Sequence, residues 1–288
     1  MMCVPMTVVV LDFDGTMTDA EAEGRPFRDG YLADLCALVG RPAGDAEIAS
    51  IADEVEAELA RAPEAHPFLW MGRAVAPATV DPYLRMVPIA HRILDRFDAF
   101  AGAADRSRLL GSVLYRYNYA KTLGHPVFRP GASHALRGLR GTPTWIVTNS
   151  DTDTVAEKLA ALDRDAPGVA WLMSRVRGEA RKFDVDDEWT DAPESLAVPG
   201  LDRPVLLRRR HYHAILRAIL DEASAEFADL VVIGDIFELD LAMPLALGAR
   251  VGLVGSDHTP AYERAFVAAH PRGHIIDDLR DIPQLVLA

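Results

Sequence analysis

Short apolar runs rich in β-branched residues constrain the fold of this 288-residue chain more than any other feature. A continuous run of this kind is typical of a strand buried on both faces of a parallel sheet. Helical patterns lie between the runs, which predicts βαβ units. We therefore expect an α/β fold with a doubly wound parallel sheet. Its strands are expected at residues 7–11, 144–147, 169–173, 230–233 and 250–254, and its helices at 132–139, 152–162, 211–223 and 240–247.

Residues 20–122 break this alternation. Apolar residues recur there at helical spacing, as at Ile48, Val55 and Leu59, and the sequence shows no convincing strand. We expect four or more helices, divided by an irregular segment that contains several prolines.

The predicted domains are an α/β core (residues 1–19 and 123–288) and an inserted α-helical domain (residues 20–122). The Pro- and Gly-containing residues 125–131 are expected to be a hinge, and residues 177–207 a β-hairpin or a long loop.

Composition narrows the possible partners. The formal net charge of −13 produces a field that repels nucleic acid and anionic lipid. No apolar stretch approaches the length of a membrane span, and the N-terminus lacks a signal-peptide pattern. The two cysteines, Cys3 and Cys36, form neither a zinc pattern nor a disulfide framework. We expect a cytoplasmic monomer or homodimer that binds neither nucleic acid nor membrane.

Acidic residues follow two of the predicted strands. Asp12 and Asp14 end the first strand in LDFDGT, and residues two apart in an extended segment point the same way. Asp235 follows another buried strand in VVIGDIFELD, with Asp240 at the start of a helix. Parallel strands present their carboxyl ends on one side of a sheet, so these four acids can converge on a hard cation such as Mg²⁺.

A hydroxyl and an amide follow a third strand. In WIVTNS, Thr148 and Asn149 stand where they could donate to a phosphoryl oxygen. In isolation, such a segment is just as often a turn that caps the next helix, and an Asp-Gly turn such as Asp14-Gly15 is also common.

The segments LDFDGTMTD, WIVTNS and VVIGDIFELDLAMPLALGARVGLVG resemble the first, second and fourth motifs of the haloacid dehalogenase (HAD) superfamily. They come in the right order, each at the end of a buried strand, and HIIDDLRDIPQLVL resembles the end of many members. The resemblance implies a Rossmann-like core, with the insert at the position of a type 1 helical cap. It also implies a Mg²⁺-dependent phosphatase that acts on a small phosphorylated metabolite.

The resemblance assigns a role to each motif residue. Asp12 would attack phosphorus and form an aspartyl-phosphate, and Asp14 would protonate the leaving oxygen and then activate water. Asp240 would act through water or by orienting a neighbour, and Thr16 would orient Asp14 or its loop. The expected metal site consists of Asp12, Asp14, Asp235 and Asp240, and the expected phosphate site of Gly15, Thr148, Asn149 and Lys182.

The third motif of the family usually supplies a lysine just ahead of the helix before the Gly-Asp strand, and two residues compete for this place. Lys182 follows Thr148 at a spacing typical of the family but lies far ahead of Asp235. Arg210 opens the expected helix but lies far from Thr148. A compact ammonium can touch both the nucleophile and the phosphoryl group, so we prefer Lys182 and keep Arg210 as the alternative.

Two other functions stay open for this sequence. A phosphomutase or phosphotransferase would use the same pair Asp12 and Asp14. A catalytically silent binding protein on the same fold would have no need for an acid two residues after a nucleophile. The resemblance also implies that members which break carbon–halogen bonds lack an acid at the position of Asp14, so its presence favours phosphoryl transfer.

Overall fold

The computed structural model describes residues 7–122, 124 and 126–287. Cys3, the expected domain boundary at residue 123 and His125 of the expected hinge lie outside these residues. The chain forms two compact units. Of the described residues, those within Met1–Asp19, Phe68–Ala76 and Phe128–Ala288 form the first unit, and those within Ala20–Pro67 and Pro77–Val127 form the second.

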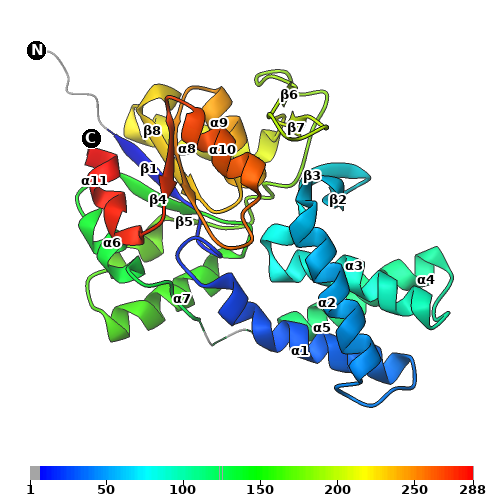
Figure 1. The fold of residues 1–288 in the computed structure, drawn as a ribbon. Helices are drawn as coiled ribbons and strands as arrows, with labels where there is room; N and C mark the ends of the chain where they lie inside the picture. Colours follow the sequence, from blue (N-terminus) through cyan, green and yellow to red (C-terminus); the bar gives the residue numbers. More distant parts are fainter. Residues whose placement is uncertain (1–6, 123, 125, 288) are drawn as a thin grey trace, which may run out of the picture. The chain divides into compact units, whose positions relative to one another are not determined.

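A six-stranded parallel sheet forms the centre of the first unit (Figure 1). Its strand order is β10-β9-β8-β1-β4-β5. The chain therefore builds outward from β1 in one direction and then in the other, which confirms the predicted doubly wound sheet and places its switch point beside β1. The strands are β1 (Val8–Leu11), β4 (Thr144–Val147), β5 (Val176–Arg177), β8 (Leu230–Gly234), β9 (Arg250–Val254) and β10 (Gly273–Ile276).

Alternate side chains of the strands build two apolar cores, one on each face of the sheet. Val8 and Val10 pack with α8 (Arg210–Ala223), α9 (Ala242–Ala246) and α10 (Ala261–Ala269) on one face. Val9 and Leu11 point to the other face, where the chain adds the helices α6 (Ala132–Gly138), α7 (Thr152–Asp165) and α11 (Ile282–Leu287). Because helices cover both faces, functional side chains are confined to the ends of the strands.

The predicted strand at residues 169–173 is wrong. The segment Ala170–Arg175 forms a 3₁₀ turn, and the edge strand of the sheet, β5, follows it. The Asp163 carboxylate accepts hydrogen bonds at 2.7–2.9 Å from three successive backbone N–H groups that begin at Gly168. These donors therefore cannot join a strand ladder, and Leu172 is buried by the turn instead.

The second unit is helical, as the periodicity of the insert predicts. The apolar stripe of Ile48, Val55 and Leu59 is buried. Asp45 and Asp81 cap the helices that follow them, each accepting two backbone N–H groups. The helices are α1 (Ala20–Leu38), α2 (Ala46–Arg61), α3 (Pro82–Arg96), α4 (Ala103–Ser107) and α5 (Arg116–Tyr119), with a π-helical stretch at Arg108–Tyr115.

The insert also contains a two-stranded hairpin, which corrects the expectation that it holds no strand. β2 (Pro67–Trp70) and β3 (Arg73–Pro77) pair with each other across Met71 and Gly72. Both turn residues have positive φ, 48° and 79°, as a tight two-residue hairpin requires. Two of the prolines in this segment, Pro67 and Pro77, stand at the outer ends of the strands. Most of this hairpin groups with the first unit, although its neighbours in the chain belong to the second.

The segment between β5 and α8 is a long excursion that contains one short antiparallel pair. This pair joins β6 (Ser195–Leu196) to β7 (Val205–Leu206). Lys182 therefore stands on the loop after β5, and Arg210 opens α8. Among the described residues, no helix is long and apolar enough to cross a membrane.

Candidate active site

Three neighbouring strands bring the predicted motifs together. Asp12 follows β1, Thr148 follows β4 and Asp235 follows β8, and β1 lies between the other two. The backbone N–H of Asp12 donates to the carbonyl of Ile233 at 2.8 Å, which ties the end of β1 to β8. Parallel pairing therefore explains why residues more than 200 positions apart meet at one edge of the sheet.

Three carboxylates form a compact cluster at this edge. Asp12, Asp235 and Asp240 each offer an oxygen atom within 4.8 Å of the others. The hydroxyl of Thr16 lies 3.0 Å from Asp12 Oδ2 and 3.0 Å from Asp235 Oδ1, so it bridges two of the acids. A π-helical turn, Phe237–Leu241, follows β8 and returns Asp240 toward the strand end, where Asp240 Oδ2 accepts the N–H of Ile236 at 3.0 Å.

Two glycines permit this close approach. Gly15 has a φ of 85°, and a Cβ atom at this position would lie 2.3 Å from Asp235 Oδ2. A Cβ atom at Gly234 would lie 2.6 Å from Asp240 Oδ2. Neither acid could keep its place beside a larger residue. Gly15 therefore shapes the acidic cluster, whatever it contributes to phosphate binding.

Lys182 supplies the cation beside the predicted nucleophile. Its Nζ lies 2.6 Å from Asp12 Oδ1 and 2.8 Å from Asp240 Oδ1, and the side chain is 1% exposed. Arg210 lies elsewhere, with a side chain that is 68% exposed and a guanidinium 3.4 Å from Asp186. Between the two sequence candidates, the geometry favours Lys182 as the cation next to Asp12.

Burial and mutual repulsion shift the titration of the cluster. Burial raises the pKa of Asp12 to about 7, with Asp240 adding to the rise and the charge of Lys182 opposing it. Burial also raises the pKa of Asp235 well above its usual range, reinforced by Asp12 and Asp240. Burial would lower the pKa of Lys182, but the charges of Asp12 and Asp240 outweigh it and raise that pKa. The single ammonium of Lys182 therefore does not balance the charge of the three carboxylates when all of them are ionised.

The donor set fits a divalent metal ion. Three carboxylates and one ammonium leave two uncompensated negative charges in the cluster. All the offered ligand atoms are oxygens, which Mg²⁺ prefers. The acids that could hold the ion are Asp12, Asp235 and Asp240.

Asp14 points to a different set of partners. Ser150 Oγ donates to Asp14 Oδ2 at 2.7 Å, Lys158 Nζ lies 2.7 Å from Asp14 Oδ1, and Thr148 Oγ1 lies 3.4 Å from Asp14 Oδ2. The side-chain oxygen of Asn149 accepts the backbone N–H of Lys182 at 2.8 Å. The two aspartates of the first motif therefore have separate surroundings, one acidic and one lined by hydroxyls and an ammonium.

Sequence reasoning missed three residues near the site. Ser150 belongs to the WIVTNS segment, where a serine is also typical of a turn. Lys158 lies on α7 without any motif, so nothing in the sequence points to it. Arg209 is fully buried, although an arginine in a basic run usually faces solvent. Only the fold could show that the middle arginine of that run faces inward.

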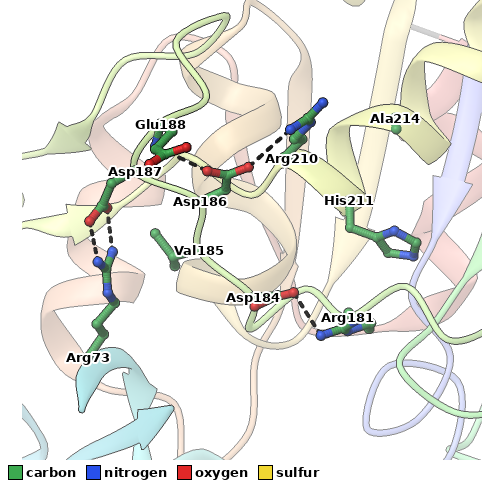
Figure 2. A pocket seen from close by; sticks show the side chains of 10 residues that line it. All are labelled: Arg73, Arg181, Asp184, Val185, Asp186, Asp187, Glu188, Arg210, His211 and Ala214. Atoms are coloured by element: carbon green, nitrogen blue, oxygen red, sulfur yellow. Dashed lines mark hydrogen bonds and ion pairs between the residues drawn. The ribbon is translucent and has the colours of Figure 1, made fainter. Parts of the chain in front are cut away.

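A separate cavity of about 660 Å³ lies beside the loop that follows Lys182 (Figure 2). Three arginines at this cavity pair with acids there: Arg73 with Asp187, Arg181 with Asp184 and Arg210 with Asp186. Asp12, Asp14 and Asp235 do not line it. The cavity is therefore distinct from the acidic cluster.

The comparisons with known proteins identify the family and the fold. The sequence model of the haloacid dehalogenase-like hydrolases matches residues 6–248. The chain belongs to this family. The comparison of this HAD-like hydrolase with curated proteins gave no match.

Solved structures with the same fold cover almost the whole chain. A putative HAD-hydrolase from Bacillus subtilis, YfnB, whose structure holds magnesium, is 15% identical with a TM-score of 0.52, covering 99% of this chain and 100% of its own. A predicted phosphoglycolate phosphatase from Haemophilus somnus is 13% identical with a TM-score of 0.53, covering 98% of each chain. A haloacid dehalogenase-like hydrolase from Xanthomonas campestris is 17% identical with a TM-score of 0.51, covering 98% of this chain and 95% of its own. At these identities the likeness shows the fold alone.

Proposed function

We propose that this HAD-like hydrolase is a Mg²⁺-dependent phosphatase that acts on a small phosphorylated metabolite through an aspartyl-phosphate on Asp12. The observation that carries the proposal is that Asp12 and Asp14 have different surroundings. One lies beside a buried ammonium within the acidic cluster, and the other is held by Ser150 and Lys158. Phosphoryl transfer to water requires both a nucleophile and a separate acid–base group.

In the first half of the reaction, a carboxylate oxygen of Asp12 bonds to phosphorus while the bond from phosphorus to the ester oxygen breaks. Asp14 gives a proton to that leaving oxygen, so the alcohol departs neutral. Lys182 neutralises charge on Asp12 and on the phosphoryl oxygens, and it is already in place before the substrate arrives. Thr148 stands close enough to donate to a phosphoryl oxygen once its contact with Asp14 is exchanged.

In the second half, Asp14 takes a proton from a water molecule, whose oxygen attacks phosphorus. The bond between phosphorus and Asp12 breaks, which releases inorganic phosphate and restores the Asp12 carboxylate. Ser150 and Lys158 hold the Asp14 side chain in place for this step. Asp12 and Asp235 would hold Mg²⁺, which would supply positive charge for the phosphoryl oxygens.

The second unit is proposed to act as a type 1 cap that selects the substrate. Two properties support this role. The unit is helical, and its chain is inserted between the first motif at Asp12 and the second at Thr148. Caps of this kind exclude water from the site when they close.

Phosphate release from a panel of phosphorylated metabolites, with and without Mg²⁺, tests the proposal. We expect release of inorganic phosphate that requires Mg²⁺ and is lost in Asp12→Asn. Transfer of the phosphoryl group to a second sugar without free phosphate would instead identify a mutase or phosphotransferase. Halide release from a haloacid without any phosphatase activity would identify a dehalogenase.

A further inference from the structure

Arg209 is a buried cation that the proposed chemistry does not use. Its side chain is fully buried, and all of its hydrogen bonds to the described residues go to backbone carbonyls. The acceptors are Leu206 at 3.1 Å, Val75 at 3.0 Å and Lys182. Burial lowers the pKa of Arg209 to about 10, so the guanidinium is charged at neutral pH. A charge placed on three carbonyls from three chain segments acts as a structural clamp.

The segment that Arg209 holds is strained. Glu179 and Arg181 have positive φ values of 52° and 45°, a conformation that residues other than glycine rarely adopt. Both backbone groups of Lys182 are fixed by side chains: its N–H donates to Asn149 and its carbonyl accepts Arg209. A strained loop persists only where its surroundings hold it, so these two contacts keep the ammonium in place.

The hairpin from the insert joins the same clamp. The Val75 carbonyl of β3 accepts Arg209, and the Trp70 ring of β2 lies 4.6 Å from the ring of Phe183, the residue after Lys182. Arg73 pairs with Asp187 farther along the loop (Figure 2). All of these residues lie in the first unit, so the hairpin supports the loop that carries Lys182.

We infer that Arg209 is a positioning residue for the phosphatase reaction: it fixes the backbone of Lys182, and with it the ammonium beside Asp12, and ties this loop to the β2–β3 hairpin. The inference about catalysis rests on the proposed function, but the effect on the Lys182 loop does not. Loss of Arg209 should release the loop and move the ammonium away from Asp12. A misplacement of about 1 Å in such a group costs on the order of a hundredfold in rate.

The first test needs no activity. Hydrogen exchange is measured at the Lys182 amide, the donor to Asn149, in the wild type, in Arg209→Met and in the control Arg217→Met. Arg217 lies in α8, the helix that begins directly after Arg209, and its acidic partners are Asp221 and Glu226. We expect exchange at Lys182 to be at least about tenfold faster in Arg209→Met than in Arg217→Met, with β8 equally protected in both.

The second test asks whether Arg209 acts through Lys182. With the best phosphorylated substrate, Arg209→Met should lower kcat by about ten- to a hundredfold and change KM much less. The same substitution in a Lys182→Ala background should change kcat by less than about twofold, because the group that Arg209 positions is already gone. A general structural role would lower kcat equally in both backgrounds.

Arg209→Lys keeps the charge but cannot reach three carbonyls at once, so its effects should be intermediate. If Arg209→Met does not fold, both measurements on Arg209→Lys decide the question. If exchange at Lys182 is faster in Arg209→Met but the wild-type protein releases no phosphate, the proposed function is overturned and the clamp stands. Exchange like that of the control, or an equal loss of kcat in both backgrounds, would overturn the clamp.

Discussion

The ammonium of Lys182 lies 2.6 Å from the carboxylate of Asp12, although the two residues are 170 positions apart in the chain. The same ammonium lies 2.8 Å from Asp240, so it joins the ends of two strands to the loop after a third. The charge is fixed in a buried site before any substrate binds. Preorganised charge of this kind stabilises a transition state without the cost of reorienting solvent.

Substitution of Lys182 is expected to damage catalysis more than substitution of Arg210. Lys182→Ala removes the cation beside Asp12 and should lower kcat/KM by about a hundredfold or more. Arg210→Ala removes an exposed side chain that contacts Asp186, so its effect should be much smaller. Steady-state kinetics of both variants checks the ranking, and a larger loss in Arg210→Ala would reverse the assignment.

Asp12→Asn should abolish turnover and leave the fold intact. The variant loses the nucleophile but keeps its shape, and it removes one of three crowded negative charges. Relief of like-charge repulsion is expected to raise the melting temperature of the metal-free protein. Circular dichroism and thermal melts check the fold, and kcat near the wild-type value would refute the assignment of the nucleophile.

Asp14→Asn should disable the enzyme, because the variant lacks both the acid of the first step and the base of the second. If the second step is slowed more than the first, aspartyl-phosphate should accumulate, which acid quench and mass spectrometry of the intact protein can detect. Lys158→Gln removes the ammonium 2.7 Å from Asp14 and should lower kcat less than Asp14→Asn does. In the Asp14→Asn background, Lys158→Gln should have little further effect.

The sequence predicts the sheet and most of the site because both depend on local patterns. Buried β-branched runs identify β1, β4, β8 and β9, and acidic or hydroxyl residues at their ends identify Asp12, Thr148 and Asp235. The positions of these residues then follow from parallel pairing. The edge strand was misplaced because Asp163 captures backbone donors several residues away, an interaction without a periodic signal.

The missed residues reach the site through long-range packing. Lys158 meets Asp14 across 144 positions, and Arg209 meets Val75 across 134. A lysine on an amphipathic helix and an arginine in a basic run usually face solvent, so the sequence alone predicts that both side chains are exposed. The prolines that flank the hairpin indicate an irregular segment, so the sequence does not predict its two strands. In each case the deciding partner lies on an element whose place only the assembled fold defines.

Removal of metal is expected to abolish activity, and Ca²⁺ is expected to inhibit. The cluster offers only oxygen ligands, and Mg²⁺ demands compact octahedral geometry. The larger Ca²⁺ accepts more ligands and could engage both oxygens of Asp12, which would hold back the nucleophile. Phosphatase assays in excess EDTA, followed by Mg²⁺ or Ca²⁺ addition, measure this, and full activity in EDTA would contradict it.

The stability of the metal-free protein should depend on the charge of the acidic cluster. In the unfolded chain Asp12 has its ordinary pKa of 3.8, whereas burial raises its pKa to about 7 in the folded protein. Between about pH 4 and pH 7 the folded state therefore holds a proton that the unfolded state has released. The free energy of unfolding falls as the pH rises through this window.

Asp12→Asn lacks this contribution, so the melting temperature of the variant should exceed that of the wild type by more at pH 8 than at pH 5. Mg²⁺ binds the deprotonated carboxylates, so it should raise the melting temperature of the wild type more at pH 8 than at pH 5 and narrow the gap. Thermal melts of both proteins at the two pH values, with EDTA or Mg²⁺, measure these differences. A gap that stays constant with pH would show that Asp12 titrates with its ordinary pKa.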